Sequence, residues 1–295
     1  MNYEDFISNK TFILESCGIN VNLDELNPKL FNFQRDIVRW ALAKGRAAIF
    51  ADCGLGKTIM QLEWADQIRK HTGGKVLILA PLAVSNQTKR EGETFGINVN
   101  ICSSQADVTA DAVNITNYEK LDNFIGNEFA AIVLDESSIL KAFAGKIRNQ
   151  IINCFAKTPY KLACTATPAP NDFMELGNHS EFLGVMTRAE MLSMFFVHDG
   201  GETSKWRLKG HAESLFWQWM SSWCVVVDNP QKLGYNAEGY VLPELSIKQI
   251  IVDGVEPVME PLTLTERREA RRESLSERCK AAANIINNSA ENWLV

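Results

Sequence analysis

The sequence lacks several features that would place the protein in a special class. Its seven cysteines form no CxxC pair, and its four histidines show no metal-ligand spacing, so a zinc site is not expected. No run approaches the roughly 20 apolar residues of a membrane helix. The start, MNYEDFISNK, is not the basic and then apolar segment of a secretory signal. These absences predict a cytoplasmic protein without a membrane partner, whose cysteines are small core residues.

The sequence also has fewer basic than acidic residues. The chain carries 30 Lys and Arg against 36 Asp and Glu, a net charge of −6, which argues against a surface coated in basic patches. Binding of DNA through a local groove stays open, because affinity follows local phosphate contacts rather than global charge. The 295 residues are 46% apolar and 22% charged, without a repeat or low-complexity segment. This balance is typical of a globular protein of one large domain or two ordinary ones.

What the sequence does contain is an alternation of short apolar runs and amphipathic segments. We predict strands at 46–51, 75–81, 97–102, 111–116, 130–136 and 160–167. We predict helices at 31–45, 58–70 and 146–156, where apolar residues recur at helical spacing. Strands that alternate with helices predict an α/β fold with a central parallel sheet covered on both faces. Ligands of such sheets bind at the carboxyl ends of the strands.

Composition divides the chain into four predicted parts. Residues 1–27 are an N-terminal arm of open role, and 28–180 are the α/β lobe. Residues 181–264 are a mostly helical extension, with helices at 187–197 and 211–223 and short strands at 224–227 and 245–252. Residues 265–295 comprise a charged helix at 265–288 and then NWLV, which looks like the opening of a further strand.

The segment ADCGLGKT, residues 51–58, follows the first predicted strand. It matches the Walker A pattern, except that Ala51 replaces the first glycine. In such loops backbone N–H groups cradle a polyphosphate, the lysine reaches the β- and γ-phosphates, and the threonine binds Mg²⁺. The helix that follows adds the positive end of its dipole. The alternative is a chance glycine turn, which the strand–loop–helix context disfavours. The predicted phosphate site is Asp52, Cys53, Gly54, Leu55, Gly56, Lys57 and Thr58, with Thr58 as a Mg²⁺ ligand.

A pair of acids follows the strand at 130–136. Asp135 is placed to hold Mg²⁺, usually through water, and Glu136 to polarise an attacking water. Two adjacent acids after a buried strand also occur as a solvated turn. The phosphate loop upstream favours the catalytic interpretation.

Three further residues fit the same chemistry less specifically. The amide of Gln34 carries a donor and an acceptor that suit the edge of adenine, although an isolated glutamine is more often a surface residue. Thr165 and Thr167, in CTATPAPN, follow the last predicted strand, where their hydroxyls are placed to relay between the acids and bound DNA. A plain strand-end turn with two prolines is the competing account.

The ordered set FQRDIVRWAL, ADCGLGKT, LILAPLAVSNQ, ITNYEKL, VLDESS and TATPAPN resembles the helicases and translocases of superfamily two over roughly residues 30 to 180. Within that superfamily, which includes the DEAD/DEAH-type helicases, the chain looks most like the SWI/SNF-type group, and closest to helicase-like proteins of phages and prophages. The stretch from WMSSWCVVVDNPQKLGY to YVLPELSIKQIIV is similar, more loosely, to the segment that follows the first lobe in that group. DESS departs from DEAD and DEAH, which puts the usual coupling contact of the last residue in doubt.

The resemblance implies a RecA-like P-loop NTPase lobe that hydrolyses ATP with Mg²⁺. Lys57, Asp135 and Glu136 would be the catalytic residues, Asp135 and Thr58 would hold Mg²⁺, and Gln34 would recognise adenine. The partner would be DNA, most simply a duplex held mainly through its backbone. The residues implied for DNA contact or coupling are Pro81, Thr116, Asn117, Tyr118, Thr165 and Thr167.

The family uses two motor lobes, and the second supplies arginine fingers to the γ-phosphate. The chain ends about where that lobe would start, so we expect the first lobe alone, completed by further residues or by a partner chain. RREARR, residues 267–272, is rich in arginine, but alternating charge along a helix usually marks a solvated, salt-bridged face. Three functions stay open: an ATP-dependent DNA helicase or translocase, a single-lobe ATP- and DNA-binding module with little turnover, and the motor part of a restriction-type ATPase.

Overall fold

The computed structural model describes residues 16–141, 145–199, 202–236, 239–240, 244, 247, 249–252 and 263–290. The chain divides into two compact units, residues 1–241 and residues 242–295. Each unit is described by itself. Within the described residues, no helix combines the length and apolar character needed to cross a bilayer.

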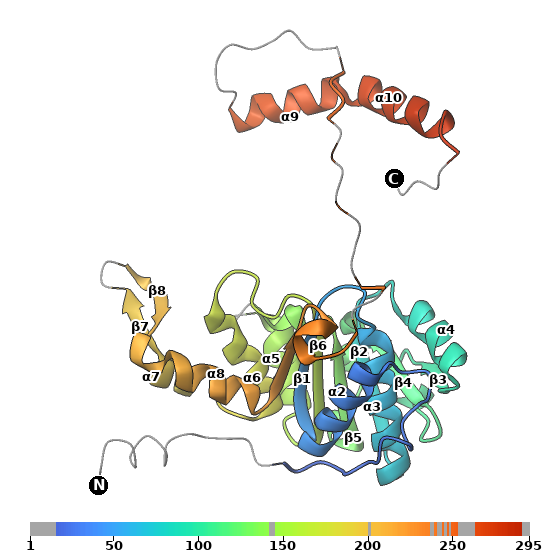
Figure 1. The fold of residues 1–295 in the computed structure, drawn as a ribbon, viewed down its shortest axis with the longest axis vertical. Helices are drawn as coiled ribbons and strands as arrows, with labels where there is room; N and C mark the ends of the chain where they lie inside the picture. Colours follow the sequence, from blue (N-terminus) through green and yellow to red (C-terminus); the bar gives the residue numbers. More distant parts are fainter. Residues whose placement is uncertain are drawn as a thin grey trace. The chain divides into compact units, whose positions relative to one another are not determined.

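A seven-stranded sheet forms the centre of the first unit, with the order β3-β4-β2-β5-β6-β1-β9 (Figure 1). The paired strands all run parallel. The strands are β1 (Arg46–Ala51), β2 (Lys75–Ala80), β3 (Val99–Ile101), β4 (Val113–Asn117), β5 (Phe129–Asp135), β6 (Tyr160–Thr165) and β9 (Cys224–Val227). Central strands such as β1 and β2 are almost continuously buried, as expected when both faces of a parallel sheet are covered. The α/β prediction is confirmed.

Helices cover both faces of this sheet (Figure 1). Alternate residues of β1 serve the two cores: Ala47, Ile49 and Ala51 face α2 (Asn32–Lys44) and α3 (Lys57–Thr72), whereas Ala48 and Phe50 face the other layer. The remaining helices of the unit are α4 (Ser85–Phe95), α5 (Lys146–Cys154), α6 (Leu176–Leu183), α7 (Arg188–Phe195) and α8 (Glu213–Ser221). Short 3₁₀ turns are η1 (Gln105–Asp107), η2 (Tyr118–Asn123), η3 (Gly126–Glu128), η4 (Ser137–Lys141), η5 (Phe173–Glu175), η6 (Gly210–Ala212) and η7 (Pro230–Leu233).

The six strands and three helices predicted before residue 180 are all present, most with ends shifted by one or two residues. Between residues 181 and 241 the structure differs in two ways. The strand at 224–227 belongs to the main sheet, where β9 pairs with β1. The helix predicted to reach residue 197 ends at Phe195, and β7 (Phe196–Asp199) follows, paired with β8 (Glu202–Leu208) in an antiparallel hairpin beyond α7 and α8 (Figure 1). The signal that was missed is the Gly-Gly pair between the two strands.

The described part of the N-terminal arm is attached to the lobe. The amides of Gly18 and Ile19 donate to the carbonyls of Ala43 and Leu42 at the end of α2. Ile19 and Leu26 are buried against the same core that holds α2 and α3. Residues 16–27 are therefore packed against the lobe, and residues 1–15 lie outside the described residues.

The second unit contains α9 (Leu264–Glu273) and α10 (Leu275–Asn287). The prediction of a single helix at 265–288 is wrong. The helix is interrupted at Ser274, whose hydroxyl donates to the carbonyl of Ala270 at 2.7 Å. Thr263 caps α9 through a capping box with Glu266. The strand predicted at 245–252 is absent from residues 247 and 249–252, and the rest of that range, like NWLV, lies outside the described residues.

Candidate active site

The carboxyl ends of three neighbouring strands bring most of the candidate residues to one edge of the sheet. β1 leads into the phosphate loop, β5 ends at Asp135, and β6 ends at Thr165. The strands adjoin in the order β5-β6-β1, with Asp135 level with Cys164 and Phe50 level with Thr165. The topology thus places the loop, the two acids and the threonines side by side, where a parallel sheet binds its ligands.

The phosphate loop has the backbone of an anion-binding turn. Gly54 and Gly56 have φ of +80° and +77°, a region that glycine enters without strain. α3 begins directly afterwards at Lys57, so its first N–H groups and its dipole point toward the loop. The Nζ of Lys57 donates to the carbonyls of Ala51 at 2.9 Å and Asp52 at 3.2 Å. The ammonium therefore lies within the loop.

Gln34 connects the start of α2 to the phosphate loop. Its Oε1 accepts from the N–H of Phe31 at 3.0 Å, and its Nε2 donates to the carbonyl of Leu55 at 3.0 Å. A Cβ on Gly56 would lie 2.4 Å from that Nε2, so the glycine is what allows the amide to approach. Gln34 is buried, and its recognition of adenine stays a prediction.

An aromatic hollow of about 580 Å³ lies at the start of α2, lined in part by the residues that precede Gln34 in the sequence. The ring of Tyr240 stands edge-on to Phe31 and to Phe33, at centroid distances of 6.0 and 5.5 Å. The tyrosines carry no sequence signal for this site, because they lie about two hundred residues from Gln34, a separation of the order of a whole domain. The lining residues are Phe31, Asn32, Phe33, Tyr235, Asn236, Gly239 and Tyr240.

Asp135 is the last residue of β5 and is half-buried. Burial raises the pKa of its carboxyl, while the neighbouring Gln61 amide and the charge of Lys57 lower it. The hydroxyl of Tyr118 donates to the Asp135 carbonyl at 2.7 Å. Burial, followed by the charges of Asp135 and Glu136, raises the pKa of Tyr118 far above its usual value, so this hydroxyl stays protonated as a donor.

Glu136 has an unusual backbone and a fixed carboxylate. Its φ is +55°, the sole positive value of a non-glycine residue in the described part of the chain, and such a conformation costs about 1–2 kcal/mol. Its Oε1 accepts from the hydroxyls of Ser138 at 3.0 Å and Thr165 at 2.7 Å. The N–H of Thr167 in turn donates to the Thr165 hydroxyl at 3.1 Å. Thr165 is therefore bonded directly to the acid, and Thr167 is connected to it through Thr165.

Two polar residues near the acids were missed from the sequence. Gln61, one helical turn beyond Lys57, is fully buried beside Asp135. His179, in α6, is also fully buried, and its Nε2 lies 3.1 Å from the hydroxyl oxygen of Ser137. No clear sequence signal marked them: in LGNHSEFL, for example, His179 is one of four polar side chains.

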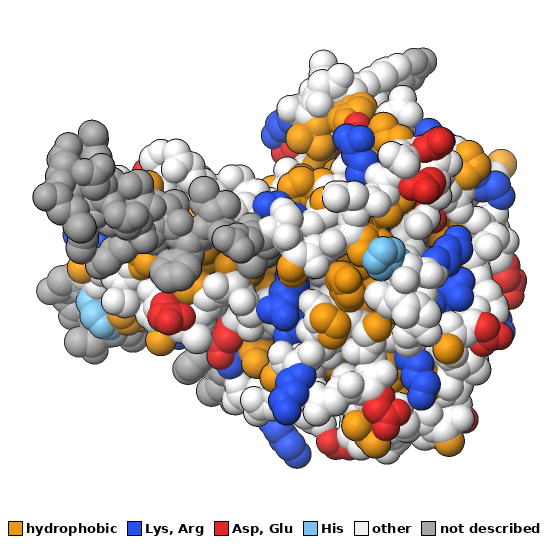
Figure 2. All heavy atoms as spheres, turned by 90° about the horizontal axis from the view of Figure 1, so that it is seen from below, with side chains coloured by type: hydrophobic (Ala, Val, Ile, Leu, Met, Phe, Trp, Pro, Cys, Tyr) orange, Lys and Arg blue, Asp and Glu red, His pale blue; other side chains and the backbone are white. Residues whose placement is uncertain are grey.

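The residues predicted to contact DNA differ in exposure. Thr116, Asn117 and Tyr118, at the end of β4 and the start of η2, are all buried. Pro81, just after β2, is half-buried. Their contact with DNA stays a prediction. On the face drawn in Figure 2, the described Lys and Arg side chains are interspersed with acidic and uncharged ones.

The chemistry of the donors fits Mg²⁺. Asp135 offers a carboxylate and Thr58 a hydroxyl, and Mg²⁺ in proteins is usually held by one or two carboxylates together with waters and substrate phosphates. Within the described residues no group of three His, Cys, Asp or Glu side chains is arranged to hold a metal alone. The protein ligands here thus suit a metal that arrives with a polyphosphate.

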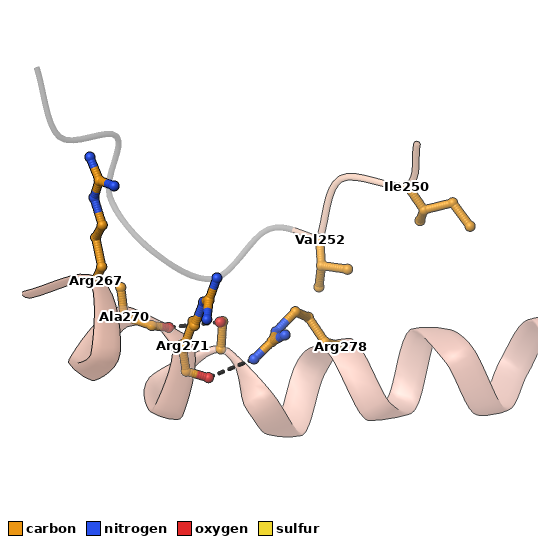
Figure 3. Close-up of a pocket in the computed structure, with 7 residues that line it drawn as sticks. Ile250, Val252, Arg267, Ala270, Arg271 and Arg278 are labelled. Atoms are coloured by element: carbon orange, nitrogen blue, oxygen red, sulfur yellow. Dashed lines mark hydrogen bonds between the residues drawn. The ribbon is translucent and has the colours of Figure 1, made fainter. Parts of the chain in front are cut away.

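Three arginines of the second unit line a separate hollow of about 440 Å³ (Figure 3). The guanidinium of Arg278 donates to the carbonyl of Arg271 at 2.6 Å. The four arginines of RREARR are exposed, and among the described residues none forms an ion pair with an acid of α9. The face is solvated as predicted, but in the described part of the chain α9 lacks the expected salt bridges. The hollow is lined by Ile250, Val252, Arg267, Ala270, Arg271, Ser274 and Arg278.

Residues 27–170 match the family described as "Type III restriction enzyme, res subunit". The fold of these residues is the RecA-like α/β lobe that the sequence predicted. The lobe is similar in fold to the Sulfolobus solfataricus SWI2/SNF2 ATPase core in complex with dsDNA, with a TM-score of 0.57 and 20% identity over 68% of this chain and 45% of that chain. The SWI2/SNF2 ATPase core domain of the same organism gives a TM-score of 0.53 and 19% identity over 74% of this chain and 45% of that chain.

The chain thus spans under half the length of these two structures, and the similarity to them concerns the fold. The UvsW helicase from bacteriophage T4 is also similar, with a TM-score of 0.45 and 16% identity over 63% of this chain and 66% of that chain. At that level the closeness of the motor lobe to phage proteins stays a prediction. No curated protein matches the sequence significantly.

Proposed function

We propose that this chain provides the ATP-binding motor lobe of an ATP-dependent DNA helicase or translocase. The observation that carries the proposal is the convergence of Lys57, Asp135 and Glu136 at one edge of the sheet. The bond from Thr165 to Glu136 supports coupling between hydrolysis and the TATPAPN segment. A cytoplasmic location is part of the proposal.

The phosphate loop would bind the polyphosphate through its N–H groups and the Lys57 ammonium. The base would lie in the aromatic hollow beside Gln34, where the faces of Phe31 and Tyr240 suit a purine. Thr58 and Asp135 would hold Mg²⁺, which neutralises charge on the β- and γ-phosphates when bound. Glu136 would orient and deprotonate the attacking water, because its carboxylate is held in place by Ser138 and Thr165.

The proposed partner is duplex DNA. The support for this partner comes from a protein of similar fold. One SWI2/SNF2 ATPase core of similar fold was solved in complex with dsDNA. We expect contacts mainly to the backbone, which give little sequence preference. The second lobe that would close on ATP is expected from residues beyond this chain or from a partner.

A restriction-type ATPase motor is the second candidate function. It is favoured by one observation, the match of residues 27–170 to the res subunit family of type III restriction enzymes. The two candidates share the ATP site and differ in what the motor serves. A methyltransferase or nuclease that co-purifies with this chain would favour the second candidate.

The two loop glycines provide a matched test of the ATP site. Both have a positive φ, but an added Cβ at Gly56 would meet the Gln34 amide at 2.4 Å, whereas one at Gly54 would meet nothing within 4 Å. We expect Gly56→Ala to weaken ATP binding about tenfold more than Gly54→Ala. Titration calorimetry with ATP and Mg²⁺ measures both. Equal losses of ATP affinity in the two variants would mean that Gln34 is not part of the ATP site.

Salt dependence tests the proposed grip on DNA. If the lobe binds mainly phosphates, the logarithm of its affinity for a duplex should fall linearly with the logarithm of salt concentration, at a slope of about −0.9 for each phosphate contacted. Fluorescence anisotropy with two labelled duplexes of unrelated sequence measures the slope and the sequence preference together. Affinity that is indifferent to salt, or strongly dependent on sequence, would contradict backbone binding.

A further inference from the structure

His179 lies behind the acidic pair and has no role in the function proposed above. Its side chain is fully buried, and the ring packs edge-on against Phe50 at a centroid distance of 5.2 Å. Its Nε2 is hydrogen-bonded to the Ser137 hydroxyl at 3.1 Å. Ser137 is itself fully buried and directly follows Glu136. Water cannot compete for this bond, and loss of either partner would leave a buried polar group unpaired.

The neighbour of His179 contacts the other end of the same turn. Asn178 donates from Nδ2 to the carbonyl of Lys141 at 3.1 Å. Ser137 and Lys141 are the first and last residues of η4. Two consecutive side chains of α6 therefore hold both ends of the turn that follows Glu136.

Glu136 needs such support, because its left-handed backbone persists only where the surroundings enforce it. The N–H of Ile139 donates to the Glu136 carbonyl at 3.2 Å, so the residue forms part of the start of the turn. On the other side, Thr165 and Ser138 hold its carboxylate. A turn that shifted away from α6 would carry the carboxylate away from Thr165.

We propose that His179 is a positioning residue, which anchors η4 through Ser137 and thereby aims the carboxylate of Glu136. Burial lowers the pKa of the imidazole to about 4, so the ring is neutral near pH 7 and acts as a hydrogen-bonding group rather than as an acid. The effect on hydrolysis rests on the function proposed above, whereas the effect on the turn does not.

Three substitutions test the anchor. His179→Phe keeps a ring against Phe50 and removes the hydrogen bond, and Ser137→Ala removes the partner hydroxyl. Ser180→Ala is the matched control, because this adjacent buried serine donates away from the acids, to the carbonyl of Met186 at 2.8 Å.

Hydrogen exchange of the full chain without nucleotide is the first readout. We expect the amides of residues 137–141 to exchange about tenfold faster in His179→Phe and in Ser137→Ala, since each loses one buried hydrogen bond. Ser180→Ala should leave the exchange of these amides unchanged. All three variants should leave the exchange of the β1 amides unchanged. Unchanged exchange of η4 in His179→Phe would overturn the proposal.

ATP hydrolysis with duplex DNA is the second readout. His179→Phe and Ser137→Ala should each lower kcat about tenfold with little change in the KM for ATP, and the double variant should lose no more. His179→Gln, which can still hydrogen-bond Ser137, should recover part of kcat. A kcat equal to wild type in both single variants would overturn the proposal. A wild-type chain that binds ATP but does not hydrolyse it would instead count against turnover by this lobe alone, and the exchange result would still decide the role of His179.

Discussion

Glu136→Gln is expected to lower DNA-stimulated ATP hydrolysis by about 10²–10⁴-fold while ATP binding is kept. The amide oxygen of glutamine can still accept from Ser138 and Thr165, the two hydroxyls that hold the Glu136 carboxylate. The substitution therefore removes the capacity to accept a proton and leaves the geometry in place. Steady-state hydrolysis and calorimetric titration of ATP, carried out on the same preparation, separate the two effects.

The matched control for Glu136 is Glu119→Gln. Glu119 lies exposed in η2, and its replacement should change neither hydrolysis nor binding. If Glu136→Gln hydrolysed ATP at a rate within threefold of wild type, another group would have to be the base. If it lost ATP binding as well, Glu136 would be a ligand of the nucleotide rather than of the water.

Lys57→Ala is expected to reduce the affinity for ATP by about a hundredfold or more. The ammonium lies within the loop, bonded to the carbonyls of Ala51 and Asp52, and is placed to form charge-assisted hydrogen bonds to phosphate that contribute about 1.5–3 kcal/mol each. Its loss also removes the positive charge that lowers the pKa of Asp135 against burial. Calorimetric titration with ATP and Mg²⁺ measures the change.

Lys70→Ala controls for the general loss of a lysine from α3. Lys70 lies at the other end of that helix, where its ammonium pairs with Asp66 at 2.7 Å and is largely exposed. We expect ATP affinity to be unchanged in this variant. Equal affinities of wild type and Lys57→Ala would mean that the loop does not hold the phosphates.

Much of the fold follows from local patterns in the sequence. Buried parallel strands such as RAAIFA and KVLILA are short apolar runs between helices, and glycines mark the phosphate loop. The parts that were missed depend on contacts between distant residues. β9 joins the sheet beside β1, from which it is far removed in sequence, and nothing within CVVV indicates which sheet it enters.

The candidate site was predictable to the same extent. The loop, the acids and the threonines belong to motifs whose residue types fix their chemistry, and the strand order brings them together. Ser137, His179 and Gln61 belong to no such motif, and their importance depends on burial and on neighbours that only the folded chain supplies. The aromatic hollow beside Gln34 likewise joins α2 to residues that follow β9.

Hydrolysis of ATP by this chain, measured at steady state with and without saturating duplex DNA, tests the proposed motor function most directly. The account predicts that turnover rises with DNA and disappears in Lys57→Ala, because the site contains the groups that hold phosphate, metal and water. Turnover that is indifferent to DNA would contradict the proposed motor. ATP bound without turnover at any DNA concentration would contradict competence of this lobe by itself, and would favour a single-lobe module that binds ATP and DNA.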